Sequence, residues 1–250
     1  MQPIYSKTFM QSKADILARL QNEILSLQGF KPASASAQTD FGLGHIAHSF
    51  PNATFPFSAL HEFSCGSWEE LASSSAFIAG LLSSSLKKGG IALWIGKQRL
   101  IFPPALKTFG VNPDQFVFIH LKKEKEVLWT VEEALKCNSI VNVIGELPEL
   151  QFTESRRLQL AIEQSGVGCF LLRHRPRNLT TASTARWRLK HLPSIAENGL
   201  PGMGYCRWKV DLLKVRNGKP GSWIVEWTDN GFRHPSKLAV IPGQLQKKTG

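Results

Sequence analysis

The sequence predicts an α/β fold with a mostly parallel β-sheet, helices on both of its faces and antiparallel strands at the carboxyl end. Between residues 59 and 172, short and continuously apolar runs alternate with longer segments of helical periodicity. Strands that are apolar throughout are typical of a parallel sheet buried on both faces. Beyond residue 183, two segments instead alternate apolar and polar residues on either side of a Gly- and Pro-containing turn, as antiparallel strands do. With 250 residues, the chain is long enough for one large domain with appendages.

The N-terminal segment is predicted to be a helical arm, residues 1–28, followed by a linker, residues 29–44. Ser12 and Asp15 make a start similar to a capping box, and the linker is rich in Ala, Ser, Gly and Pro. Four apolar residues share one face of the arm: Ile16, Leu20, Ile24 and Leu27. The arm either docks on a partner or folds back onto its own domain, and both alternatives stay open.

The main domain is predicted over residues 45–230, with an antiparallel extension from about residue 183 and a flexible tail over residues 231–250. The predicted strands are Ala59 to Ser64, Gly90 to Ile95, Gln115 to Leu121, Ser139 to Ile144, Cys169 to Leu172, Arg207 to Val215 and Ser222 to Trp227. Three longer helices are predicted: one that follows Ser67, one over Glu124 to Cys137, and one from a cap at Thr153 to Ser165. A short helix is predicted near Pro103.

A strand, a tight loop at Cys65-Gly66-Ser67 and a long amphipathic helix follow one another from Ala59 to Leu82. This order produces the geometry that holds phosphate in P-loop proteins. In that register Leu71 and Ala72 replace the lysine and the hydroxyl residue of a working loop, and Cys65 and Glu70 replace its two glycines. The sequence therefore predicts a degenerate P-loop, with the shape of a nucleotide site but without its charges, and no bound cofactor.

Glu146 follows another predicted strand and lies at the edge of the sheet where ligand sites of parallel sheets are found. A carboxylate there could bind a metal ion or act as a general base. Without the lysine and the hydroxyl we expect Glu146 to be structural or vestigial, and we expect no metal.

The chain is basic, with a formal net charge of +11, which favours a polyanionic partner such as nucleic acid over a surface kept basic for solubility. The segment from residue 173 to 191 contains six basic residues and no acid: Arg173, Arg175, Arg177, Arg186, Arg188 and Lys190. These residues are candidates for contact with nucleic acid or with a protein partner. Trp187, Trp208, Trp223 and Trp227 could stack on exposed bases, but alternating strands favour a role in the core.

Several other classes of site are excluded by spacing. The four cysteines lie far apart without a CxxC pair, as in buried cytosolic thiols. His61 lies within a predicted buried strand, so it is read as a core histidine and not as part of a protease site.

No apolar run approaches the roughly 18 residues of a membrane span, and the N-terminus lacks a secretory signal, so a cytoplasmic protein is expected.

Several stretches of the chain resemble the RecA-like fold, and within it the ImuA family of accessory proteins in bacterial mutagenic translesion synthesis. The matching segments are ALHEFSCGS, IALWIG, FPPALKTFGV, LWTVEEALKC, VIGELPEL, TESRRLQLAIEQSGV, STARWRL and RWKVDLLKVRNGKPGSWIVEW. The last two segments, which are rich in Arg and Trp, are the most specific for this family. The resemblance extends over roughly residues 40 to 228, and likeness to RecA alone would not define a function.

The resemblance implies a non-catalytic adaptor of error-prone repair that works with an inactive, polymerase-like protein and a replicative-type polymerase. RecA and single-stranded DNA are further candidate partners. Lys97 and Gln98 occupy the end of the strand where an active RecA-type ATPase has its catalytic glutamate, which agrees with a non-catalytic role. Three alternatives remain: a cell-division inhibitor of the SulA kind, a regulator of RecA filaments, and an ATPase with an atypical site.

Overall fold

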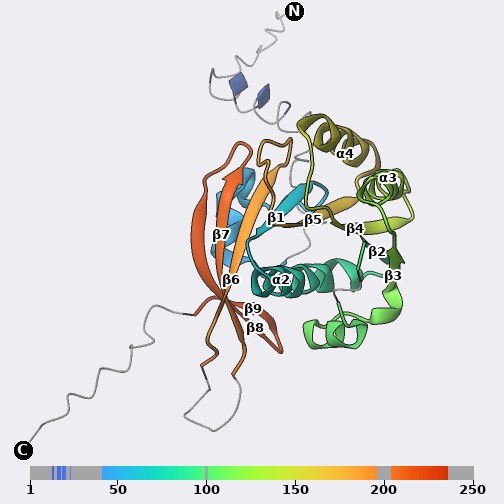
Figure 1. The fold of residues 1–250 in the computed structure, drawn as a ribbon. Helices are drawn as coiled ribbons and strands as arrows, with labels where there is room; N and C mark the ends of the chain where they lie inside the picture. Colours follow the sequence, from blue (N-terminus) through green and yellow to red (C-terminus); the bar gives the residue numbers. More distant parts are fainter. Residues whose placement is uncertain are drawn as a thin grey trace, which may run out of the picture. The chain divides into compact units, whose positions relative to one another are not determined.

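The structure is a computed structural model that describes residues 41–98, 101–195 and 204–235, together with six residues of an N-terminal helix. Those six helical residues are Lys13, Ile16, Leu17, Arg19, Leu20 and Glu23. The chain divides into two compact units, residues 1–38 and residues 39–250, and each is described by itself. All the sheet strands and the other helices belong to the second unit (Figure 1).

The described part of the second unit contains one nine-stranded sheet with the order β3-β2-β4-β5-β1-β6-β7-β8-β9. The strands are β1 (Leu60–Cys65), β2 (Ile91–Gly96), β3 (Phe116–His120), β4 (Ile140–Glu146), β5 (Gly168–His174), β6 (Ala185–Leu192), β7 (Cys206–Val215), β8 (Gly221–Thr228) and β9 (Gly231–Arg233). All pairings from β3 to β6 are parallel, and those from β6 to β9 are antiparallel. The predicted fold class is therefore confirmed.

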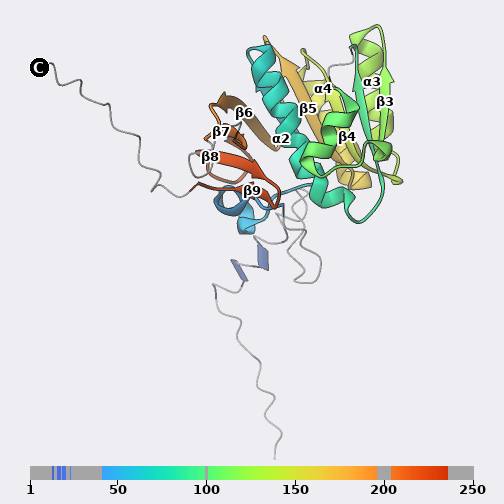
Figure 2. The same ribbon diagram turned by 90° about the horizontal axis from the view of Figure 1, so that it is seen from below.

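Helices cover both faces of the parallel part of the sheet (Figure 2). The α-helices are α2 (Trp68–Leu86), α3 (Glu124–Leu135) and α4 (Phe152–Ser165). The short 3-10 helices are η1 (Gly44–Ser49), η2 (Pro51–Ala53), η3 (Pro103–Phe109) and η4 (Pro113–Gln115). Helix α2 packs with the C-terminal strands into one apolar cluster, whereas α3 and α4 pack on the other face into a second cluster.

Local capping residues fix where two of the helices begin. Ser67 is the N-cap of α2, and its hydroxyl accepts the backbone N–H of Glu70. For α4 the expected cap at Thr153 is wrong, because Gln151 caps the helix and pairs with Glu154 in a capping box. The sequence favours Thr153 as the cap because Gln is a less common N-cap residue than Thr.

Three segments differ from the predicted organisation. Strand β6 lies in the basic segment, to which no strand was assigned, and it joins the sheet parallel to β1, so the antiparallel part begins only at β7. Residues 231–233 form β9 and are not part of a flexible tail, since Phe232 packs on Phe77 of α2 and on Trp227. Residues 41–44, assigned to the linker, belong to the domain because Phe41 stacks on Phe57 and Leu43 is buried.

The tryptophans of the C-terminal strands form core, as expected. Trp187, Trp208 and Trp227 are buried, and the partly buried Trp223 packs against the same cluster. His61 is also a core residue: its Nε2–H donates to the Pro56 carbonyl (2.8 Å), and Nδ1 accepts from the Trp187 indole (3.3 Å). The second contact needs a neutral ring, because a protonated Nδ1 cannot accept, and burial lowers the pKa of His61 to about 4.

Candidate interaction site at the carboxyl edge of the parallel sheet

The loop between β1 and α2 is too short to enclose a phosphate. Only Gly66 and Ser67 separate Cys65, the last residue of β1, from Trp68, the first residue of α2. The Gly66 N–H donates to Glu70 Oε2 (2.7 Å), so a carboxylate of the protein already occupies the position that an anion would take. The strand, the tight loop and the helix lie where the sequence predicts them, but the Gly66 N–H is bound to a carboxylate of the protein, so it is not free for a phosphate.

The residues at the degenerate P-loop positions carry no charge that could bind a triphosphate. Leu71 is buried and packs in the core on the α2 face, whereas Ala72 is exposed. Cys65 is buried, and this burial raises the pKa of its thiol to about 11, so it is not a reactive thiolate. Glu69 and Glu70 in the first turn add negative charge where phosphates would have to bind.

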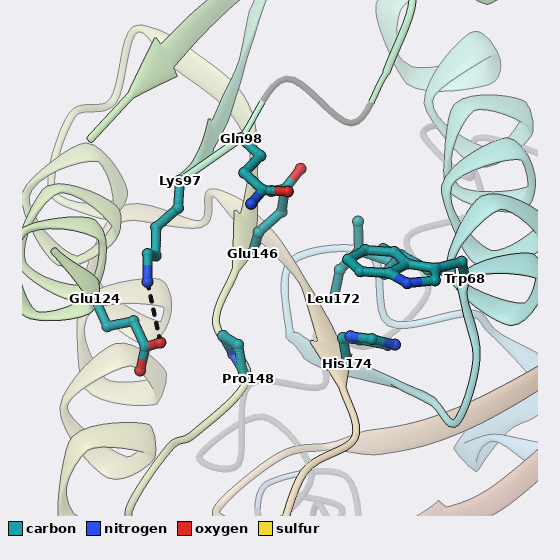
Figure 3. A pocket seen from close by; sticks show the side chains of 9 residues that line it. Trp68, Lys97, Gln98, Glu124, Glu146, Pro148, Leu172 and His174 are labelled. Atoms are coloured by element: carbon teal, nitrogen blue, oxygen red, sulfur yellow. Dashed lines mark ion pairs between the residues drawn. The ribbon is translucent and has the colours of Figure 1, made fainter. Parts of the chain in front are cut away.

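A small pocket nevertheless lies at this edge, beyond the carboxyl ends of β1, β2, β4 and β5 (Figure 3). Its volume is about 160 Å³. The lining residues are Trp68, Leu71, Lys97, Gln98, Glu124, Glu146, Pro148, Leu172 and His174. Lys97 and Glu124 lie on one wall and Trp68 and His174 on the opposite wall, with Glu146 between them (Figure 3).

Glu146 is held rigidly at the bottom of the pocket. Its side chain is only 8% exposed, and Oε1 accepts the indole N–H of Trp94 (2.7 Å). The carboxyl group lies against Gly96, where any side chain would collide with Oε2. Burial raises the pKa of Glu146 to about 7, an effect that the Trp94 hydrogen bond partly offsets.

The two walls differ in character. Trp68, which is 55% exposed, packs against His174 with ring centroids 4.2 Å apart and the two ring planes tilted by 30°. On the opposite wall, Lys97 Nζ forms an ion pair with Glu124 (3.6 Å) between two half-exposed side chains. Trp68 and His174 could not be paired from the sequence, because residues more than 100 positions apart meet only through the pairing of β1 with β5.

Two of the predicted contact residues are buried and cannot reach a ligand on the surface, so that prediction is wrong for them. Arg186 Nε donates to Glu62 Oε2 (3.0 Å), and Arg173 Nη1 lies 3.6 Å from the same oxygen. Glu62 and Arg173 are fully buried, and Arg186 is nearly so. Strands β5 and β6 flank β1 and bring both guanidinium groups to Glu62. An acidic residue inside a predicted apolar strand was the signal for this ion pair.

The other four members of the basic segment are exposed: Arg175, Arg177, Arg188 and Lys190. Arg175 Nε donates to the Gly66 carbonyl (3.1 Å), so this residue lies beside the loop after β1. On β6, Lys190 lies directly opposite Lys209 of β7. Lys209 is also paired with Asp211 (3.5 Å), which lies opposite Arg188. Three basic side chains beside one carboxylate leave an excess of positive charge, which makes this part of the sheet a candidate for binding an anion.

The apolar face of the N-terminal arm is described only in part. Ile16 and Leu20 are helical and about half exposed, as a docking face requires. Ile24 and Leu27 lie outside the described residues. Within the described residues, no helix is long and apolar enough to cross a membrane, and no group of His, Cys, Asp and Glu could hold a metal ion.

The order of the strands and the position of α2 after β1 define a RecA-like α/β protein. Its structure resembles the crystal structure of the RadB recombinase with a TM-score of 0.54 and 13% identity, over 79% of this chain and 100% of that chain. No protein-family model matches the chain.

Two relatives identify the family. The ImuA proteins of Caulobacter vibrioides strains NA1000 and ATCC 19089 are each 30% identical to this chain over 213 residues, which cover 79% of this chain and 87% of the relative. The chain therefore belongs to the ImuA family, as its sequence motifs suggested.

Proposed function

We propose that this protein is a non-catalytic accessory factor of error-prone translesion DNA synthesis that bridges polymerase components in the cytoplasm. One observation carries the proposal: Glu70 fills the anion position of the loop after β1, and Leu71 replaces the lysine that a nucleotide would need. A RecA-like domain modified in this way keeps a scaffold for binding partners without the means to hydrolyse ATP.

Membership of the ImuA family supports the biological setting. The resemblance implies two partners, an inactive polymerase-like protein and a replicative-type polymerase, with RecA as a further candidate. The partly exposed apolar face at Ile16 and Leu20 is suited to docking on such a protein.

The experiment that tests this function is the damage-induced mutation frequency of a strain that lacks the protein, with cell length scored alongside. We expect mutagenesis to be lost, cell length to be normal, and the wild-type protein to restore mutagenesis. Unchanged mutagenesis with shorter damage-induced filaments would contradict the proposal and favour a division inhibitor. Normal cell length with altered RecA filaments in vitro would favour a filament regulator.

Weak contact with single-stranded DNA is a second candidate function, supported by the like-charged pair Lys190 and Lys209 beside the exposed Arg188. Replacing all three residues with Ala should weaken binding and lower the slope of log K against log salt by about 2, since each single-strand phosphate contact contributes about 0.7. The measurement is fluorescence anisotropy of a labelled oligonucleotide at several salt concentrations.

The matched control replaces three other exposed lysines with Ala: Lys87, Lys107 and Lys125. It lowers the net charge by the same amount as the first variant. If this control reduces the salt slope as much as the β6–β7 variant, the contact is diffuse and the proposed surface is wrong. A further variant, Arg175→Ala with Arg177→Ala, tests whether the loop after β5 is the contact instead.

A further inference from the structure

The pocket at the carboxyl edge contains two polar atoms that no part of the described chain satisfies. Glu146 Oε1 accepts from Trp94, but Oε2 has no hydrogen-bond donor among the described residues although the side chain is about nine-tenths buried. His174 Nε2 is likewise buried without a hydrogen-bond partner. An unsatisfied buried polar atom is costly, so His174 Nε2 indicates that the pocket is completed by something outside the described chain. Glu146 Oε2, which is not among the fully buried atoms, is an acceptor that such an occupant can reach.

The charges around the pocket favour a cationic occupant. Lys97, the one lysine among the lining residues, is already paired with Glu124 on the same wall. No ion pair of Glu146 is present within the described residues, where its only hydrogen bond comes from an uncharged indole. A negatively charged group would meet Glu146 and the acidic first turn of α2, so a phosphate is disfavoured.

The size of the pocket and its aromatic wall further limit the kinds of group that can occupy it. A pocket of about 160 Å³ is smaller than the roughly 300–1,000 Å³ of sites that hold whole small molecules, so it fits one long side chain. Leu71, Pro148 and Leu172 can contact an aliphatic stem. The exposed ring of Trp68 offers a surface on which a planar cation stacks better than an ammonium group does.

We infer that this pocket binds an arginine side chain of a protein partner, with the guanidinium group on Glu146 Oε2 and its plane stacked on Trp68. The positions of the guanidinium and the stem follow from the lining residues, whereas the protein origin of the arginine rests on the proposed adaptor function. On this view, the site that holds a nucleotide in related folds has become the anchor point for a partner's side chain.

The test uses the ¹⁵N-labelled full-length protein and Nα-acetyl-arginine amide as the probe. We expect the indole N–H resonances of Trp68 and Trp94 to shift, the first from stacking and the second because it shares Glu146 with the ligand. The neutral isostere Nα-acetyl-citrulline amide should produce no such shift, and Nα-acetyl-lysine amide should bind more weakly than the arginine probe.

Three variants assign the effect to the pocket. Glu146→Gln, which can still accept the Trp94 N–H, should weaken binding at least about tenfold, and Trp68→Ala should weaken it as well. Glu124→Gln removes a carboxylate from the opposite wall and should have a much smaller effect, because that group is already paired with Lys97. Melting curves of each variant establish that it is folded.

The inference would be overturned if the arginine probe caused no shift, or if the citrulline or lysine amide bound as tightly as the arginine probe. It would also be overturned if the Glu146→Gln variant bound the arginine probe as tightly as the wild type. Shifts with guanosine monophosphate but not with the arginine probe would also overturn it and would make the pocket a nucleobase site. The adaptor function is scored separately, since mutagenesis that depends on the protein but is unchanged by Glu146→Gln would overturn only the arginine site.

Discussion

At the scale of single residues, buried charge distinguishes this protein from an ordinary α/β domain. Glu62, Arg173 and Arg186 form a buried cluster in the centre of the sheet, and Glu146 is buried at its edge. Each of these groups is in the core because a strand places it there, and each costs free energy unless it is paired or neutral. Their roles can therefore be measured through stability and pH.

The buried ion pair predicts different effects for two arginines on the same strand. Arg186→Gln should lower the free energy of unfolding by about 3–5 kcal/mol, because it leaves the buried Glu62 short of a partner. Arg188→Gln, two residues further along β6 and exposed, should change it by less than about 0.5 kcal/mol. Urea denaturation measures both values, and equal effects would contradict the assignment of Arg186 to the core.

The buried carboxyl group of Glu146 predicts that the free energy of unfolding depends on pH. The folded protein keeps the proton of this carboxyl group up to a pKa of about 7, whereas the ordinary value is 4.5. Between these values the unfolded state binds fewer protons, so the contribution of Glu146 to the free energy of unfolding falls as the pH rises, by about 3 kcal/mol in total. Glu146→Gln lacks this loss, so its stability relative to the wild type should increase from pH 5 to pH 8.

The measurement is urea unfolding of both proteins at several pH values, with Glu124→Gln as the exposed control. His61 has the opposite effect, since its lowered pKa makes the fold less stable as the pH falls below 6.5. That effect is common to both proteins and cancels in their difference. Parallel curves for wild type and Glu146→Gln would show that the carboxyl group is not buried in solution.

At the scale of elements, aromatic packing ties the last strands to α2. Gly80 lies directly under Trp227 and Phe232, where a Cβ would come within 2.8 Å of the indole ring and 2.7 Å of the phenyl ring. The Trp227 indole N–H also donates to the Thr108 carbonyl (2.9 Å) at the end of η3. Strand β9 is therefore part of the domain although it contains only three residues.

This packing predicts that Phe232→Ala destabilises the domain. The loss should be on the order of 2 kcal/mol, below the 3–5 kcal/mol of a fully buried Phe, because Phe232 is only partly buried. Phe102→Ala is the matched control, since Phe102 is 70% exposed and its loss should have little effect. An unchanged melting temperature of the Phe232 variant would mean that residues 231–233 are a tail, as the sequence suggested.

Element by element, the apolar strands and the amphipathic helices were predictable because both follow from hydrophobic periodicity. Strand β6 was not, because its alternation of Arg and Lys with Trp and Leu has the composition of a solvated basic segment. The strand, the tight loop and the helix around Gly66 were predictable in the same way, and α2 begins after Ser67 as expected. The contact between the Gly66 N–H and Glu70 was not predictable, because a side chain that closes a loop cannot be inferred from strand and helix patterns alone.

At the scale of the whole molecule, the fold is that of a RecA-like protein, but the chemistry of its carboxyl edge has changed. The edge keeps a pocket, and acidic and aromatic side chains replace the groups that would hold a nucleotide. The net charge of +11 does not arise at this pocket, whose lining includes two carboxyl groups and one lysine. We propose that this edge binds a partner and does not hydrolyse ATP, which is the central claim of the proposed function.

Nucleotide binding tests that claim most directly. Titration of the full-length protein with a fluorescent ATP analogue in the presence of Mg²⁺ should give no saturable signal, either for the wild type or for Glu70→Ala, which frees the Gly66 N–H. Saturable binding that unlabelled ATP displaces would contradict the account, because it would show that the RecA-like domain still holds a nucleotide despite Leu71.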